Sequence, residues 1–380
     1  AHDMERKMLF AASTWSQIQN FQLAYLGHFQ GLGWRVHAAC GDAPASAPYT
    51  ERVLEVPFTK SMGSPRNFRA AALLRELIRE EGYELISVHT SLAAFFTRLA
   101  LLGMERRPLV VNTVHGYLFD GQTPLPKRRL LLAAEQWMAP VTDLVLTMNR
   151  WDLQTAQRYR LGANVVHIPG IGVDFAGFSR AASGSRERLR EALGIPQGAF
   201  VLLYAAEFSK RKSQEVLIRA MRRLPEQAVL VLTGDGALCE QCRQMARQFG
   251  LDRRVLFPGY VRNMPEWCGM ADAAVSGSRS EGLPFHIMEA MYAGLPIVAS
   301  DVKGTSDLLS DHEAGLLYPY GDDAACAAQI QRLMDSDSLR RQLGARAREH
   351  VEQYSLERVL PVVLGLYDGL LLEQTVRQRR

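Results

Sequence analysis

The chain has 380 residues, of which 47% are hydrophobic and 22% charged, a composition that excludes a disordered or fibrous protein. One hydrophobic core seldom holds so many residues, so we expect two domains of about 150–200 residues each. The net charge of +4 is small and the basic residues are scattered, which argues against a nucleic-acid partner.

Cysteine usage indicates a reducing compartment, and hydropathy predicts no membrane-spanning helix. The five cysteines are an odd number without a disulfide framework. Cys239 and Cys242 have the C-x-x-C spacing, but they lie in a helical pattern without a second pair, so we expect no metal there. No uninterrupted run reaches the roughly 18 apolar residues of a spanning helix, and no signal peptide is visible. We therefore expect a cytoplasmic protein.

Short apolar strands alternate with helical patterns through the N-terminal half. We predict strands at 7–13, 34–40, 85–89, 109–114, 143–149 and 163–168, and helices at 17–31, 68–81 and 93–102. Repeated strand and helix units of this kind imply a parallel, doubly wound sheet. Ligands of such sheets bind beyond the carboxyl ends of the strands.

Three loops at these strand ends carry candidate binding residues, among them Thr14, His89 and Tyr117. His115 directly follows an apolar strand and precedes Gly116, so its imidazole is predicted to project from the strand end. A lone histidine is more often structural, and that alternative stays open for His89, which has the same type of position.

A basic and apolar segment follows these loops. Three basic residues, Lys127 to Arg129, precede an apolar helical pattern that runs to Met138. Such a helix suits an anionic membrane surface near a lipid-linked substrate. The alternative is an ordinary core-facing helix with a solvated start.

The C-terminal half repeats the alternation. Glycines in 169–174 permit a turn between two domains. We predict strands at 200–206, 272–276, 297–300 and 314–318, strands that begin at 230 and 255, and helices at 284–293, 322–335, 338–353 and 356–372, with one more from about 213.

The helix predicted at 284–293 is preceded by a turn suited to a phosphate. Gly282 permits close approach of the backbone, Pro284 suits the first helical turn, and a helix N-terminus offers free N–H groups. Glu281 and Glu289 bracket this turn. Glu289 has apolar neighbours and is better placed to accept hydrogen bonds from ribose hydroxyls. The alternative makes Glu281 a dipole partner and Glu289 a solvated helix residue.

The segment from Glu281 to Glu289 resembles the E-x7-E signature of the retaining glycosyltransferases of family 4, and 290–300 also matches that pattern. The resemblance runs over nearly the whole chain and is nearest to enzymes that build capsular or extracellular polysaccharide. It implies the GT-B fold, an α/β architecture of two doubly wound Rossmann-like domains facing a cleft. The implied domains are an acceptor-binding domain at 1–170, a donor-binding domain at 171–355, and a terminal helix at 356–380 that crosses back to the first domain.

The resemblance also implies roles for individual residues. His115, Lys212 and Glu281 become the catalytic candidates, with His115 contacting the transferred sugar or orienting the acceptor. Relatives commonly hold an arginine where this chain has Glu207, so Arg211 or Lys210 is the candidate replacement. The implied donor-binding residues are Glu289, Gly282, Leu283, Pro284, Phe285, Gly234, Tyr260, Val261, Arg262 and Arg211.

Within that set, Gly234 would permit close approach of the nucleotide, and Tyr260 would stack on its base. The backbone at Val261 and Arg262 would read the edge of the base. A plain surface turn is the alternative for Tyr260. Thr14, His89 and Tyr117 are the acceptor-side candidates. Relatives often carry a glycine-rich first loop, whereas this chain has Ser13-Thr14-Trp15-Ser16.

No Asp-x-Asp motif occurs near the predicted phosphate loop, so we expect no metal and no cofactor, with Lys212 neutralising the leaving diphosphate. The resemblance implies transfer of a hexose or N-acetylhexosamine, with retention, from a nucleotide sugar. UDP is expected before GDP. The acceptor would be a saccharide on undecaprenyl diphosphate at the inner face of the cell membrane.

Two other functions fit the same fold: a sugar-nucleotide epimerase, and a non-catalytic subunit that binds a nucleotide sugar. A nicotinamide dehydrogenase is disfavoured, because 11–16 lacks the G-x-G-x-x-G motif.

Overall fold

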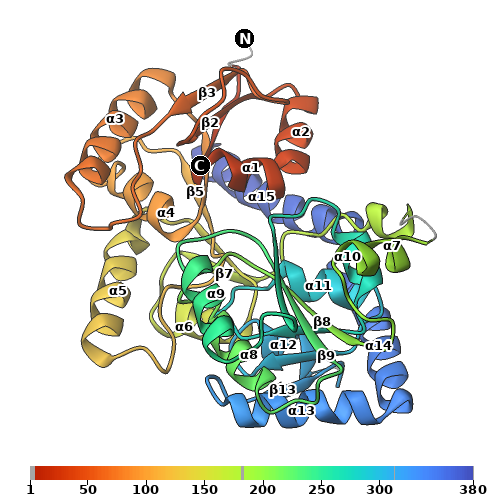
Figure 1. The fold of residues 1–380 in the computed structure, drawn as a ribbon. Helices are drawn as coiled ribbons and strands as arrows, with labels where there is room; N and C mark the ends of the chain where they lie inside the picture. The colour runs from red at the N-terminus through yellow and green to blue at the C-terminus, as the bar shows by residue number, and fades with distance from the viewer. Residues whose placement is uncertain (1–4, 181–183, 312, 380) are drawn as a thin grey trace. The chain divides into compact units, whose positions relative to one another are not determined.

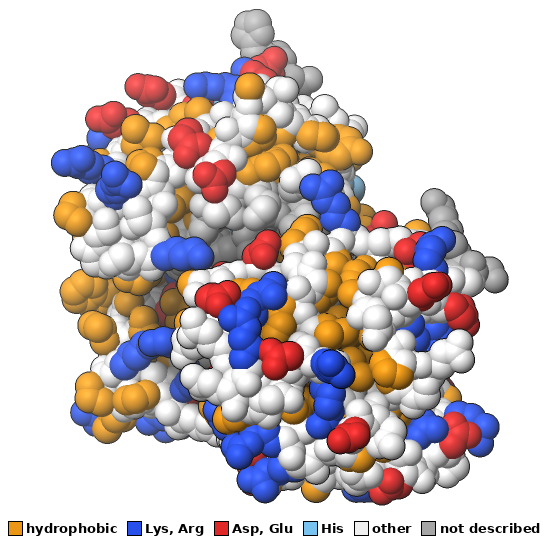
Figure 2. Space-filling view, in the orientation of Figure 1, with side chains coloured by type: hydrophobic (Ala, Val, Ile, Leu, Met, Phe, Trp, Pro, Cys, Tyr) orange, Lys and Arg blue, Asp and Glu red, His pale blue; other side chains and the backbone are white. Residues whose placement is uncertain are grey.

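The computed structural model describes residues 5–180, 184–311 and 313–379 (Figure 1). The chain divides into two compact units. The first runs to Gly172 and resumes at Val359, and the second is Val173–Arg358. Acidic and basic side chains are interspersed on the face drawn in Figure 2, as the small net charge leads us to expect.

The first unit is built on a seven-stranded sheet in the order β3-β2-β1-β4-β5-β6-β7, with every neighbouring pair parallel. Its strands are β1 (Lys7–Thr14), β2 (Arg35–Gly41), β3 (Arg52–Glu55), β4 (Leu85–His89), β5 (Leu109–Thr113), β6 (Leu144–Thr147) and β7 (Asn164–His167). The order reverses direction between β1 and β4. This switch point is where open α/β sheets bind ligands.

The helices of the first unit lie between these parallel strands in the chain, except for α15 at the C-terminal end. They are α1 (Trp15–Phe21), α2 (Leu23–Gly31), α3 (Pro65–Glu81), α4 (Ser91–Leu99), α5 (Leu125–Met138), η1 (Ala139–Val141), α6 (Arg150–Arg158) and, from Val359 onward, α15 (Leu356–Arg379). The single helix predicted at 17–31 is wrong, because the buried Gln22 separates two helices. The start of α3 is capped by the Ser64 hydroxyl, and Gly82 ends it with a φ of 65°.

Helix α15 packs on the first unit through Tyr367. The Tyr367 hydroxyl lies 2.6 Å from the Ser87 Oγ, and its ring centroid lies 5.6 Å from that of Phe29. Among the described residues, one helical stretch, Leu356–Arg377, is long and apolar enough to cross a membrane by length and composition. Charged residues interrupt the apolar run of this stretch, so it was not expected from the sequence. Of this stretch, 28% is buried, and Tyr367 is among the buried side chains that pack on the first unit.

The second unit repeats the winding with six parallel strands in the order β10-β9-β8-β11-β12-β13, reversing between β8 and β11. Its strands are β8 (Phe200–Ala205), β9 (Ala228–Thr233), β10 (Val255–Gly259), β11 (Ala273–Ser276), β12 (Ile297–Ser300) and β13 (Leu316–Tyr318). Its helices are η2 (Ala176–Arg180), α7 (Ser185–Ala192), α8 (Gln214–Met221), α9 (Cys239–Gln248), α10 (Met264–Met270), α11 (Phe285–Tyr292), α12 (Thr305–Leu309), α13 (Asp323–Asp335), α14 (Asp337–Val351) and η3 (Glu352–Tyr354).

Helix α11 is held by apolar packing and ends where the sequence predicts. Ile287, Met288 and Met291 are buried, and Gly294 has the left-handed φ of 74° that ends such helices. Pro284 occupies the N-cap position rather than the first turn, with φ −74° and ψ 120°. The turn before α11 therefore lies directly after β11, at the switch point of the second sheet.

Candidate active site

Lys212, Arg211 and Glu281 form one charged cluster at the switch point of the second unit. The first two lie in the loop after β8, and Glu281 lies in the loop after β11. Lys212 Nζ is 2.5 Å from Glu281 Oε1, and Arg211 Nη1 is 3.0 Å from Glu281 Oε2. Two cations and one carboxylate leave a net positive charge at the cluster. This charge suits an anionic ligand.

The pKa of Glu281 shows how strongly the cluster holds its carboxylate. Burial alone would raise this pKa, but Lys212 and Arg211 outweigh it and lower the pKa to about 2. Burial lowers the pKa of Lys212, and the Glu281 charge opposes that effect. Glu281 is therefore ionised at neutral pH. Arg211 contacts this carboxylate, and its role as a replacement for an arginine at position 207 stays a prediction.

Buried hydroxyls fix the cluster. Ser278 donates a hydrogen bond to Glu281 Oε1 at 2.6 Å, and the Tyr204 hydroxyl donates to the Lys212 carbonyl at 2.9 Å. Ser213 has a φ of 49°, which is unusual for a residue other than glycine, and its hydroxyl donates to the Lys210 carbonyl at 2.7 Å. Strain of this kind persists where surrounding contacts hold it, often at functional sites. Tyr204, Ser278 and Ser213 were not predicted from the sequence, because no motif marks them.

Glu289 is chemically unlike Glu281. It is half-buried in α11, and burial raises its pKa to about 7. Among the described residues its carboxylate has no hydrogen-bond partner. A carboxylate accepts hydrogen bonds from hydroxyl donors, so a ligand hydroxyl would favour its ionised form.

His286, in the same helix, was not identified from the sequence although it lies between the two glutamates. Its Nε2 atom is buried without a hydrogen-bond partner. Burial, followed by the Lys212 charge, lowers its pKa to about 3. Its ring packs edge-on against Tyr204, with centroids 5.4 Å apart. His286 is therefore neutral at physiological pH.

The other predicted donor residues occupy two environments. Gly282, Leu283 and Pro284 are buried just before α11, which Phe285 begins. By contrast, Tyr260, Val261 and Arg262 lie between β10 and α10, with Tyr260 69% exposed. Among the described residues, none of these three bonds to the Lys212 cluster.

Gly234 follows β9 with a φ of 121°. A Cβ atom there would collide with the Ala206 carbonyl oxygen, so the fold itself requires glycine at this position. Contact between Gly234 and a donor stays a prediction.

In the first unit, four side chains form a hydrogen-bonded row that ends at His115. Tyr367 Oη lies 2.6 Å from Ser87 Oγ, which lies 2.8 Å from His89 Nε2. His89 Nδ1 lies 3.1 Å from His115 Nε2. The structure thus brings the two predicted histidines together. It also adds Ser87 and Tyr367, which are 280 residues apart and were not identified from the sequence.

Burial keeps this row neutral at physiological pH. It lowers the pKa of His115 to about 4 and that of His89 well below its usual value, with the neighbouring His115 adding to the latter effect. Burial also raises the pKa of Tyr367 to about 12, so its hydroxyl keeps its proton. A neutral imidazole has one donor and one acceptor nitrogen. If Tyr367 donates to Ser87 and the row continues in that sense, His115 carries its proton on Nδ1.

Thr14 and Tyr117 have different surroundings. Thr14 ends β1, and its hydroxyl lies 3.0 Å from that of Ser16. Tyr117 is buried in a small core, where its ring stacks on Phe119 with centroids 5.4 Å apart. Aromatic packing holds the ring in place, and contact between Tyr117 and an acceptor stays a prediction. Its backbone N–H donates to Asp152 in α6 at 3.3 Å.

Within residues 5–180, 184–311 and 313–379, no group of three or more His, Cys, Asp or Glu side chains could hold a metal ion. Cys239 and Cys242 lie in α9 as free cysteines.

Known proteins match this arrangement over both units. The model of the glycosyl transferases group 1 matches residues 185–350, and that of Glycosyltransferase Family 4 matches 21–176. EpsD of Bacillus subtilis (strain 168), which carries the name of a glycosyltransferase, is 30% identical over 373 residues, covering 97% of this chain and 98% of EpsD. The D-inositol 3-phosphate glycosyltransferase of Xylanimonas cellulosilytica is 27% identical, covering 83% and 81%.

Solved structures share the fold. Sucrose-phosphate synthase from Thermosynechococcus elongatus has a TM-score of 0.80 at 21% identity, covering 97% of this chain and 100% of that one. Anabaena HepE, in complex with UDP and glucose, has a TM-score of 0.77 at 20% identity, covering 96% and 100%. The chain therefore belongs to the family 4 glycosyltransferases and has the GT-B fold of two Rossmann-like domains.

Proposed function

We propose that this enzyme transfers a hexose or N-acetylhexosamine from a UDP-sugar to a lipid-linked saccharide, with retention and without a metal. The acceptor would belong to a bacterial surface polysaccharide. The observation that carries the proposal is the cationic Lys212 cluster at the switch point of the second sheet, together with the unpartnered carboxylate of Glu289. The name of EpsD supports glycosyl transfer, and the UDP complexes of HepE support the choice of donor.

The donor would use the two glutamates differently. Glu289 would accept hydrogen bonds from the ribose hydroxyls, since its carboxylate has no partner among the described residues. Glu281 is already engaged by Lys212 and Arg211, so it would position these cations rather than touch the nucleotide. The diphosphate would lie at Lys212 and Arg211, beside the N-terminus of α11, whose dipole favours an anion.

Charge develops on the leaving diphosphate when the bond between the anomeric carbon and the phosphate oxygen breaks. Lys212 and Arg211 would stabilise that charge. The acceptor oxygen would attack on the same face, and its proton would pass to the leaving phosphate. His115 is neutral at pH 7, so it would serve by hydrogen bonding to the transferred sugar and not as an acid.

A membrane-associated acceptor is supported by α5. Glu135 and Met138 face inward, and Glu135 pairs with Arg98 at 2.9 Å. Leu130 and Trp137 are 71% and 73% exposed on the same helix, whose first turns are basic. The combination suits an interfacial helix at the inner face of the cell membrane. Flotation with liposomes would contradict this part of the proposal if anionic lipid gave no preference over neutral lipid.

Calorimetric titration of UDP, GDP and ADP, each in EDTA and in Mg²⁺, tests the donor proposal. UDP binding in EDTA that is lost in Glu289→Ala and Lys212→Ala would support it. Absence of nucleotide binding under both conditions would favour a non-catalytic partner subunit. Conversion of a UDP-sugar without any acceptor would favour an epimerase. The anomeric configuration of the product, read by NMR, tests retention.

A further inference from the structure

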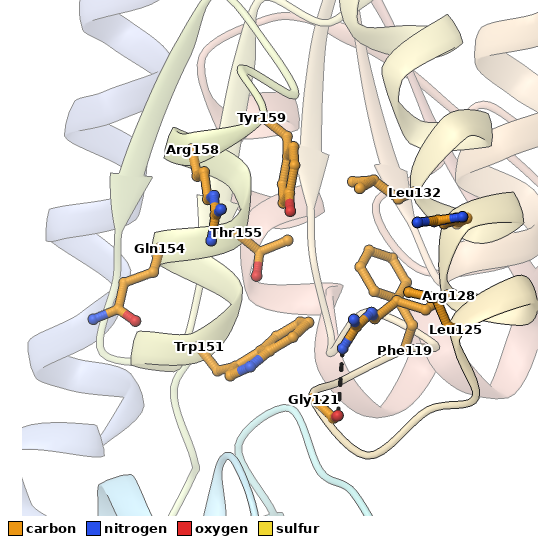
Figure 3. Close-up of a pocket in the computed structure, with 11 residues that line it drawn as sticks. Phe119, Gly121, Leu125, Arg128, Leu132, Trp151, Gln154, Thr155, Arg158 and Tyr159 are labelled. Carbon is orange, nitrogen blue, oxygen red and sulfur yellow. Dashed lines mark hydrogen bonds between the residues drawn. The ribbon is translucent and has the colours of Figure 1, made fainter.

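A second concave site lies within the first unit, between α5 and α6. It is a cavity of about 560 Å³, a volume typical of small-molecule sites. Figure 3 shows side chains of α5, including Arg128 and Leu132, on one side, and those of α6, including Trp151 and Arg158, on the other. None of the residues assigned above to the donor or to the histidine row lines this cavity.

The cavity is lined by cations without a carboxylate. Arg128, Arg129 and Arg158 contribute three guanidinium groups, and no Asp or Glu is among the lining residues. Within the described part of the chain, none of the three is paired with a carboxylate. Arg128 donates to the Gly121 carbonyl at 3.3 Å, which leaves most of its donors available. Arginine binds phosphate oxygens with two parallel hydrogen bonds.

The same cavity has aromatic and aliphatic walls. Phe119, Trp151 and Tyr159 contribute rings, and Phe119 packs edge-on against Trp151 with centroids 5.7 Å apart. Leu125 lines the cavity and is 46% exposed. An anionic ligand that also has an apolar part would satisfy both kinds of wall, whereas inorganic phosphate would leave the apolar part uncovered.

The cavity is joined by a short loop to His115. Phe119 is four residues beyond His115, so their Cα atoms lie no more than about 14 Å apart. Asp152 anchors this loop to α6 through the Tyr117 backbone, and Tyr117 stacks on Phe119. A ligand held in the cavity would therefore be close to the end of the histidine row.

We propose that this cavity binds the diphosphate of an isoprenoid-linked saccharide acceptor, with Arg128, Arg129 and Arg158 on the phosphates and the rings against the first isoprene units. This inference rests on the proposed function for the nature of the acceptor. It adds the residues that would bind the acceptor, and it identifies the isoprenoid diphosphate as the part of the acceptor that they would hold. A concave site between α5 and α6 would then recognise the carrier.

The test is titration of farnesyl diphosphate into the Lys212→Ala protein, in which the donor site is disabled. We expect binding at least about 10-fold tighter than that of inorganic diphosphate. In the same background, Arg128→Ala combined with Arg158→Ala should weaken farnesyl diphosphate binding by about 100-fold, since each arginine loses charged hydrogen bonds. Arg69→Ala removes an exposed arginine of α3 in the same unit and is the matched control.

Three results would overturn the inference. The first is unchanged farnesyl diphosphate binding in the double variant. The second is equal binding of inorganic diphosphate, meaning that a free phosphate suffices. The third is equal retention of the Lys212→Ala protein and its double variant on phosphatidylglycerol vesicles, with no binding of farnesyl diphosphate. That result would indicate a general affinity for anionic surfaces. UDP titration of the double variant with Lys212 intact reads the donor site separately, so failure of the proposed function would appear there and not in these titrations.

Discussion

Replacing Glu289 by glutamine should make the enzyme more stable and less able to bind its donor. The pKa of Glu289 is raised by burial to about 7, whereas its usual value is 4.5. A carboxylate with a raised pKa favours the protonated folded state. Its contribution to stability is therefore complete below about pH 4.5 and is lost as the pH rises through about 7. Glutamine carries no charge and avoids that loss.

The size of the effect follows from the shift in pKa. Each pKa unit corresponds to about 1.4 kcal/mol, so the shift from 4.5 to about 7 gives an upper value of about 3 kcal/mol. Because the residue is half-buried, remaining hydration reduces this, and we expect Glu289→Gln to gain about 1–3 kcal/mol above pH 7. Near pH 4.5 the gain should approach zero. Cys268 is the titratable neighbour that feels the Glu289 charge, and burial raises its pKa far above this range.

Urea unfolding of both proteins at several pH values measures the gain, with Glu226→Gln, an exposed residue of the same unit, as the matched control. UDP affinity, measured by calorimetry, should fall about 10- to 100-fold in Glu289→Gln, since hydrogen bonds to a charged acceptor are lost. A folded variant with no gain in stability at pH 8 would refute the reasoning, because the carboxylate would then be hydrated. A gain in stability with full UDP affinity would refute the ribose assignment alone.

Three other changes test the two sites. Lys212→Met, which keeps the apolar stem, should lower the free energy of unfolding by about 3–5 kcal/mol, because it leaves Glu281 with one cation. The difference from the wild type should fade as the pH falls from 4.5 toward about 2, and acid unfolding of both proteins would measure it. His115→Ala should lower kcat about 100-fold with UDP affinity unchanged; normal kcat and KM would contradict its role. Tyr367→Phe should lower the free energy of unfolding by about 1–2 kcal/mol, measured by thermal unfolding, and should lower kcat without changing UDP affinity. An unchanged kcat would mean that Tyr367 serves packing alone.

The fold was predictable where elements have a strong local pattern. The strands 85–89 and 297–300 have their predicted bounds, because short apolar runs between turn residues allow few alternatives. Edge strand β3 was missed, since its side chains are only partly buried and its sequence lacks an apolar run. The break at Gln22 was missed because it lies between two segments with the same apolar face.

The candidate site was predictable only where a motif marks it. Glu281 and Lys212 lie at strand ends within recognisable segments, so the sequence could identify both, and the structure brings them together. Tyr204 is a polar residue within an apolar strand, and no local pattern shows that its hydroxyl reaches the Lys212 carbonyl. The bond between Ser87 and Tyr367 is harder still, because it joins residues far apart in the chain.

That long-range bond has a consequence for the order in which the polypeptide acquires its structure. The second unit, Val173–Arg358, is continuous, so every residue it contains is synthesised before Tyr367. The first unit begins earlier but lacks Tyr367 until synthesis is nearly over, although domains generally fold as units during translation. A nascent chain released after Arg358 would therefore contain the complete second unit with an unfinished histidine row. Such fragments should retain nucleotide affinity before they acquire any transfer activity.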